Sequence, residues 1–125
     1  MQNANVRVLV VEDEPLVAMM IEEVLLRGGF SLAGSAANSG KAMKILSQTT
    51  PNVAILDLNL GYGQTSLPVA EELERRGIPF VFVTGLNEFA IPQRFRDRPR
   101  LSKPIVEEQL QGIVKTTISA SRSLV

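Results

Sequence analysis

Three separated segments of the chain are uninterrupted runs of apolar residues, and they restrict the possible fold more than any other feature. The runs cover residues 8–11, 53–56 and 80–83. Continuous rather than alternating apolar residues are typical of strands that are covered on both faces, as in parallel sheets. Because parallel neighbours need crossover connections, helices are expected between these strands. The runs therefore predict a sheet between two helical layers.

The segment after the first run has the clearest helix signals. Pro15 suits a first helical position, and Gly28 with Gly29 supplies a stop, so a helix is predicted over residues 15–27. Its apolar residues at helical spacing should face the core. They are Val17, Met20, Ile21, Val24 and Leu25.

The elements between residues 30 and 84 have weaker sequence signals. Residues 30–36 are predicted to form a strand, and Asn38 or Ser39 can cap a second helix that carries Ala42, Ile45 and Leu46 and ends before Pro51. Ser66 can cap a third helix that ends at Gly77, and residues 78–84 are predicted to form the fourth strand.

Prolines limit the last third of the chain. Pro92 and Pro99 leave room only for a short helix between residues 86 and 100, before a brief fifth strand at residues 100–102. A final helix is expected from about Pro104. Its inner side should carry the apolar residues Val106, Leu110, Ile113 and Val114.

Strands that alternate with helices predict an α/β fold, a doubly wound five-stranded parallel sheet of order 2-1-3-4-5, which is the flavodoxin-like arrangement. The 125 residues are expected to form one domain, over residues 1–125, without an output domain. In this order the first and third strands are neighbours at the topological switch point. Ligands bind beside the carboxyl ends of the strands there.

Composition excludes several kinds of chemistry. The 13 basic and 13 acidic residues cancel, which disfavours non-specific binding to nucleic acid or to an anionic membrane. The chain contains no cysteine and no histidine, so thiol nucleophiles, thiolate metal sites and imidazole bases are absent. No segment is long and apolar enough to span a bilayer, and the N-terminus does not resemble a signal peptide. We therefore expect a cytoplasmic protein with no membrane partner.

Chemically active side chains follow four of the predicted strands. Glu12 and Asp13 follow the first, Asp57 ends the third, Thr84 ends the fourth, and Lys103 follows the fifth. Each has a plain structural explanation, such as a helix cap, a turn or a solvated lysine. Acids from adjacent strand ends, however, repel one another unless a cation lies between them. Together the set predicts a metal-dependent phosphoryl site.

The ordered motifs at these strand ends resemble the receiver domains of bacterial two-component response regulators. They are Val10-Val11-Glu12-Asp13-Glu14, Ile55-Leu56-Asp57-Leu58-Asn59, Val83-Thr84-Gly85 and Ser102-Lys103-Pro104. The resemblance implies a cis peptide bond between Lys103 and Pro104. It also implies that this receiver signals through phosphorylation-dependent protein binding, or drains or relays phosphoryl groups, rather than acting as an enzyme.

The resemblance also assigns roles to the site residues. Asp57 would accept a phosphoryl group from the phosphohistidine of a histidine kinase or phosphotransfer protein. Asp13, Asp57 and the main-chain carbonyl of Asn59 would hold Mg²⁺, and Glu12 would assist through water. Thr84 and Lys103 would hold the phosphoryl oxygens.

The chain departs from the usual receiver pattern at two places. Leu101 stands where most receivers have an aromatic residue whose rotation relays phosphorylation, and residues 58–65 lack the usual proline-glycine turn. Residues 79–85 are similar to a subgroup of often stand-alone receivers of α-proteobacteria, marked by a proline-phenylalanine strand that ends in threonine-glycine. The route by which the signal leaves the site therefore stays open, as does the choice between a monomer and a weak dimer.

Four arginines alternate through one segment, at positions 94, 96, 98 and 100. In an extended chain they would share one side and form a basic ridge. The plain interpretation is a solvated face with Asp97 as an internal partner, and the functional one is a docking surface for an acidic partner.

Two other functions compete with a phosphorylated receiver. An aspartyl-phosphate phosphatase is suggested by Asp57-Leu58-Asn59, although Asn59 stands where the second acid of that signature belongs. A non-phosphorylated pseudo-receiver that only binds partners is the other alternative.

Overall fold

The fold is described here from a computed structural model, which describes residues 5–85 and 91–123. Within them, five parallel strands form one sheet of order β2-β1-β3-β4-β5, which confirms the predicted α/β architecture. The strands are β1 (Arg7–Val11), β2 (Ser31–Ala36), β3 (Val53–Asp57), β4 (Phe80–Thr84) and β5 (Arg100–Ser102). The helices are α1 (Pro15–Arg27), α2 (Ser39–Gln48), α3 (Leu67–Arg76) and α4 (Glu107–Ser123), with a short 3-10 helix, η3 (Gln93–Phe95).

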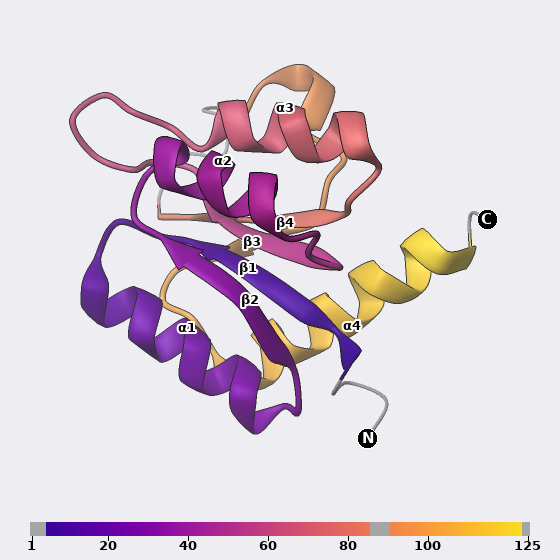
Figure 1. Cartoon of the computed structure of the whole chain (residues 1–125). Coiled ribbons are helices and arrows are strands. Elements are labelled where there is room, and N and C mark those ends of the chain that lie inside the picture. Colours follow the sequence, from indigo (N-terminus) through magenta and orange to yellow (C-terminus); the bar gives the residue numbers. More distant parts are fainter. Residues whose placement is uncertain (1–4, 86–90, 124–125) are drawn as a thin grey trace.

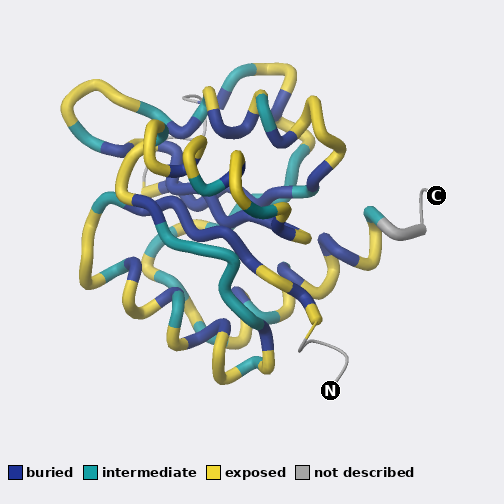
Figure 2. Tube along the Cα trace, in the orientation of Figure 1, coloured by how far each residue is buried: buried dark blue, intermediate teal, exposed yellow. Residues whose placement is uncertain are grey.

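Two hydrophobic layers cover the sheet, one on each face. Helices α2 and α3 lie over one face, and α1 and α4 lie over the other (Figure 1). Side chains of β1 alternate between them, since Leu9 and Val11 pack in the α2–α3 layer and Val8 and Val10 in the α1–α4 layer. The central strands are therefore buried on both sides (Figure 2), which is why their sequences are continuous apolar runs.

Helix α1 begins and ends where the sequence predicts. Pro15 is its first residue, and the chain leaves the helix at Gly28, whose amide donates to the carbonyl oxygen of Val24. The prediction that Met20 faces the core is wrong, since its side chain is 39% exposed. The buried side of α1 consists of Ala18, Ile21, Val24 and Leu25, so the buried stripe lies on a slightly different side of the helix than predicted.

The two helices on the other face differ in how they start. The Asn38 side chain caps α2 by accepting a hydrogen bond from the amide of Lys41 at 2.8 Å. Ser66 stands at the corresponding position of α3 but forms no capping bond, because its backbone, with a φ of −87° and a ψ of 7°, is not extended as that of Asn38 is. The prediction of a Ser66 cap is therefore wrong in its chemistry. Gly77 ends α3 in the left-handed conformation, as expected of a helix-stopping glycine.

The C-terminal part of the fold is confirmed with two corrections. The Lys103–Pro104 bond is cis, and β5 has the predicted bounds. The final helix, however, begins at Glu107 rather than near Pro104, so Val106 precedes it and is 42% exposed. The short helix expected between residues 86 and 100 corresponds, among the described residues, to the single turn η3, and residues 86–90 lie outside the description.

The arginine-rich segment does not form an extended basic ridge. Part of it is helical in η3, and two of its arginines pair with α3, Arg94 with Glu71 and Arg98 with Glu74. The Arg98 guanidinium also lies over the Phe80 ring, 5.1 Å from the centroid. Asp97 contributes a longer ion pair of 3.7 Å to Arg98. The acidic surface that these two arginines meet therefore belongs to the chain itself.

Across the described residues, the helices are each too short or too polar to cross a lipid bilayer.

Candidate functional site

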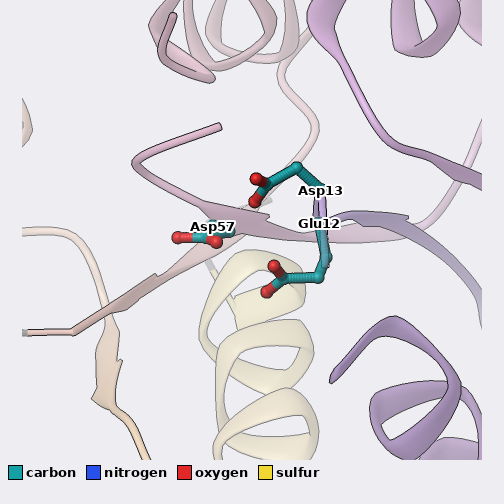
Figure 3. Close-up of side chains that lie close together, drawn as sticks. All are labelled: Glu12, Asp13 and Asp57. Carbon is teal, nitrogen blue, oxygen red and sulfur yellow. The ribbon is translucent and has the colours of Figure 1, made fainter. Parts of the chain in front are cut away.

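Three carboxylates meet at the carboxyl edge of β1 and β3. Asp57 is the last residue of β3, and Glu12 and Asp13 directly follow β1. Because Val11 lies beside Leu56 in the parallel pair, the acids that follow are brought to the same edge. Each offers an oxygen within 4.8 Å of the others, and Figure 3 shows the Glu12 and Asp13 carboxylates turned to the same side as Asp57. The expected meeting of acids at this edge is confirmed.

A lysine from the far edge of the sheet reaches these acids. The Lys103 amide donates to the carbonyl oxygen of Thr84 at 2.9 Å, which fixes the start of the segment after β5. Its side chain then donates to Oδ2 of Asp57 at 3.1 Å and lies 3.2 Å from Oε1 of Glu12. Glu14 is a more distant partner, at 3.7 Å. One ammonium group therefore faces the acids of two other strand ends.

Thr84 occupies the neighbouring strand end. It is the last residue of β4 and is buried, 7% exposed. Its chain neighbour Val83 lies beside Asp57 in the β3–β4 pair. The sheet thus places a hydroxyl-bearing residue between the strand that ends in Asp57 and the strand that leads to Lys103.

The electrostatics of the site centre on Glu12. Burial raises its pKa to about 7, and the hydrogen bond to Asp57 and the negative charge of Asp57 add to the rise. The Glu14 amide, which donates to Oε2 of Glu12 at 3.0 Å, and the Lys103 charge act in the opposite direction. Burial also lowers the pKa of Lys103, but Asp57 and then Glu12 outweigh this, so the pKa of the ammonium is raised. The site thus favours the protonated form of Glu12 and the charged form of Lys103.

The residues at this edge fit a magnesium ion. Oε1 of Glu12 is fully buried and has no hydrogen-bond partner among the described residues, although the ammonium lies at ion-pair distance. The side chains that converge are carboxylates, which are the oxygen ligands that Mg²⁺ takes. Asn59, two residues after Asp57, places its amide 3.3 Å from Oδ1 of Asp57, so its backbone follows the same edge.

The loop between β3 and α3 has a local structure that the sequence did not predict. Asn59 and Thr65 form an isolated antiparallel bridge, and the loop extends away from the sheet (Figure 1). Its tip is Gly61, Tyr62 and Gly63, all with positive φ, and Tyr62 is fully exposed. Two glycines around one aromatic residue were the available signal for this turn.

Leu101 packs inward rather than toward solvent. It lies beside Val83 in the β4–β5 pair and is half-buried against the α1–α4 layer. A leucine here fills space in the core but carries no aromatic ring or hydroxyl. The prediction that the usual aromatic relay is altered in this chain stays a prediction.

Comparison with known proteins gives a consistent result. A family model described as the response regulator receiver domain matches residues 8–115. Among curated proteins, the phyllosphere-induced regulator PhyR of Methylorubrum extorquens is 27% identical over 124 residues, which cover 93% of this chain and 45% of PhyR. The chain spans about half the length of the curated relatives it matches.

Solved structures include relatives of similar length. The solution structure of SdrG from Sphingomonas melonis Fr1 is 40% identical, with a TM-score of 0.78 and 98% of each chain covered. A second solution structure, of the BeF3-activated conformation of SdrG from Pseudomonas melonis Fr1, is 41% identical, with a TM-score of 0.73 and coverage of 92% of this chain and 93% of that one.

Proposed function

Because this chain belongs to the response regulator receiver family, we propose that it accepts a phosphoryl group on Asp57 and that this modification changes its binding to other proteins. The observation that carries the proposal is the contact of Lys103 with Asp57, 3.1 Å from Nζ to Oδ2, beside two further carboxylates. A lone acid at a strand end would need neither the lysine nor the extra acids.

The proposed reaction is a phosphoryl transfer to a carboxylate. A carboxylate oxygen of Asp57 forms a bond to phosphorus as the bond between phosphorus and the donor breaks, which leaves an acyl phosphate on Asp57. When the donor is a phosphohistidine, the imidazole nitrogen leaves and takes up a proton from water. Because the transition state is loose, the protein contributes mainly positioning and charge neutralisation. The site in this chain is arranged for these two tasks.

Magnesium is the proposed cofactor. Asp13, Asp57 and the main-chain carbonyl of Asn59 would hold it, and Glu12 would act through water. When bound, Mg²⁺ supplies two positive charges that offset the charge of the incoming oxygens. Burial of Glu12 and its contact with the Lys103 ammonium keep the free site from carrying the full repulsion of its acids.

Lys103 and Thr84 are the proposed contacts of the phosphoryl group. The Lys103 ammonium already contacts Oδ2 of the Asp57 carboxylate and can contact an oxygen of a phosphoryl group added there. The Thr84 hydroxyl is one strand away and can donate a hydrogen bond to the same group. Such a contact would bias β4 and the segment after it between two arrangements. We propose this as the origin of the signal.

The proposed donor is a histidine kinase or a phosphotransfer protein, because the chain itself contains no histidine. A downstream protein would read the phosphorylated form. The BeF3-activated structure of the related SdrG supports this proposal, since the sequences are 41% identical. Beryllofluoride is an analogue of a phosphoryl group bound to a carboxylate.

Intact-mass measurement tests the proposal. The protein is incubated with acetyl phosphate, with and without Mg²⁺, and one added phosphoryl group is expected only with Mg²⁺. Asp57→Asn should abolish the addition, whereas Asp97→Asn, which changes an exposed acid that pairs with Arg98, should leave it intact. Modification of Asp57→Asn would reject the assignment and favour a different acceptor.

Phosphate release, measured in the same incubations, separates the two competing functions. A phosphatase would release phosphate from the donor over many turnovers. A receiver would take up one phosphoryl group and afterwards consume the donor only slowly. A pseudo-receiver would show no addition in the parent protein under any condition.

A further inference from the structure

The β3–α3 loop has a second close approach to the acidic site, through a glycine rather than through a charged residue. At Gly61 an added Cβ atom would lie 3.2 Å from Oδ2 of Asp13, closer than an ordinary van der Waals contact. Gly61 also has a φ of +83°, a conformation that side-chain-bearing residues rarely adopt. Gly63, two residues later in the same turn, has a φ of +75° but nothing within 4 Å of the equivalent position.

The loop around Gly61 is held on several sides. The Gly61 amide donates to Oδ1 of Asn59 at 2.9 Å, and its carbonyl accepts from the Gln64 amide at 2.9 Å. Leu60, just before it, is 5% exposed and belongs to the α2–α3 hydrophobic layer. Ser39 of α2 donates to the carbonyl oxygen of Thr65 at 2.8 Å. Retreat of Gly61 from the site would break several of these contacts.

The Asp13 carboxylate is held less firmly. It is half-exposed, and among the described residues no hydrogen bond or ion pair fixes it. An atom added at Gly61 would therefore shift the Asp13 carboxylate by a few tenths of an ångström rather than displace the loop. Figure 3 shows that the Asp13 carboxylate is turned to the side where Glu12 and Asp57 lie, so such a shift would change its position relative to these two carboxylates.

We propose that Gly61 is a positioning residue of the magnesium site, because its missing side chain leaves the space in which the Asp13 carboxylate turns toward Glu12 and Asp57. Gly61 contacts no ion itself and acts only through Asp13. The inference rests on the proposed magnesium site and adds a residue to which the family motifs assign no role here.

The test compares Gly61→Ala with Gly63→Ala. Both substitutions place alanine at a positive φ in the same turn, so both should destabilise the fold to a similar extent. Only Gly61→Ala adds an atom beside Asp13. We expect its dissociation constant for Mg²⁺, measured by calorimetry with the metal alone, to rise about tenfold, as is typical when a partner of a metal ligand is disturbed. Gly63→Ala should bind Mg²⁺ like the parent protein.

A second measurement needs no metal. Midpoints of urea unfolding are compared for both alanine variants, each in the parent and in an Asp13→Ala background. Because the Asp13 carboxylate can yield, Gly61→Ala should be only slightly more destabilising than Gly63→Ala in the parent, and this small difference should disappear once Asp13 is shortened. If the single variant Gly61→Ala does not fold, folding of the double variant Gly61→Ala/Asp13→Ala would likewise show that the Asp13 side chain causes the destabilisation.

The outcomes separate the inference from the proposed function. Magnesium binding by the parent with equal affinities in both glycine variants overturns the role of Gly61 alone, as does a stability difference that persists without the Asp13 side chain. A parent protein that binds no Mg²⁺ overturns the proposed magnesium site and, with it, this inference.

Discussion

Nζ of Lys103 lies 3.1 Å from Oδ2 of Asp57, so an ion pair joins the ends of β5 and β3 across the intervening strand β4. The two residues are 46 positions apart in sequence and meet only because the strands are parallel and end at one edge. A phosphoryl group on Asp57 would carry its charge into the space that this lysine already faces.

We predict that Lys103→Ala weakens the response to phosphorylation more than it weakens metal binding. The substitution removes the ammonium that faces the acceptor but keeps all three carboxylates. Since a hydrogen bond to a charged group contributes about 1.5–3 kcal/mol, the affinity for beryllofluoride in the presence of Mg²⁺ should fall about tenfold or more. Titration followed by NMR measures both affinities.

Lys115→Ala, on the exposed side of α4, is the control and should bind beryllofluoride like the parent. Equal beryllofluoride affinity in Lys103→Ala and the parent would contradict the proposed role of Lys103.

We predict that Glu12 makes the metal-free protein less stable as the pH rises. The pKa of Glu12 is raised from 4.5 to about 7, chiefly by burial, so its contribution to stability is fully present below about pH 4.5 and is lost as the pH rises through 7. Glu12→Gln stays neutral and should lack this loss. The gain of the variant over the parent should grow by on the order of 3 kcal/mol between pH 4.5 and pH 8, since one pKa unit corresponds to about 1.4 kcal/mol.

Urea unfolding in a chelating buffer at several pH values measures this difference. Glu108→Gln, which changes an exposed acid of α4, should follow the parent. A pH profile for Glu12→Gln that runs parallel to that of the parent would show that folding does not raise the pKa of Glu12.

We predict that one aromatic side chain in the segment before β5 contributes strongly to the stability of the fold. Phe95 is fully buried, and its ring meets that of Phe80 edge-on with centroids 5.7 Å apart. Phe95→Ala should lower the free energy of unfolding by about 3–5 kcal/mol, the usual effect of removing a buried aromatic ring. Tyr62→Ala, at the exposed tip of the β3–α3 loop, should change it by less than about 0.5 kcal/mol.

Thermal or urea unfolding checks both values. A loss of less than about 1 kcal/mol for Phe95→Ala would mean that this segment can leave α3 without disturbing the core.

The strands and the order of the sheet could be predicted because they depend on local composition and general rules of connection. Continuous apolar runs mark β1, β3 and β4, and Pro15 and Gly77 mark helix ends through their own backbone preferences. The meeting of Glu12, Asp13 and Asp57 follows from parallel strands alone. Their location required no knowledge of side-chain packing.

The features that were wrong or missed depend on contacts between distant segments. The partners of Arg94 and Arg98 lie on α3, more than 20 positions away, and no local pattern in the arginine segment points to them. Ser66 has the right identity for a helix cap, but the backbone conformation that the preceding loop gives it is not the extended one that a capping serine adopts. The approach of Gly61 to Asp13 is likewise a contact between two loops.

A structure of the protein with Mg²⁺ and beryllofluoride tests the central claim most directly. The account predicts beryllofluoride attached to Asp57, the metal between Asp13 and Asp57, and contacts from Lys103 and Thr84 to the fluorine atoms. An Asp57 without beryllofluoride at saturating concentrations, with Glu12, Asp13 and Asp57 apart and no metal between them, would contradict it.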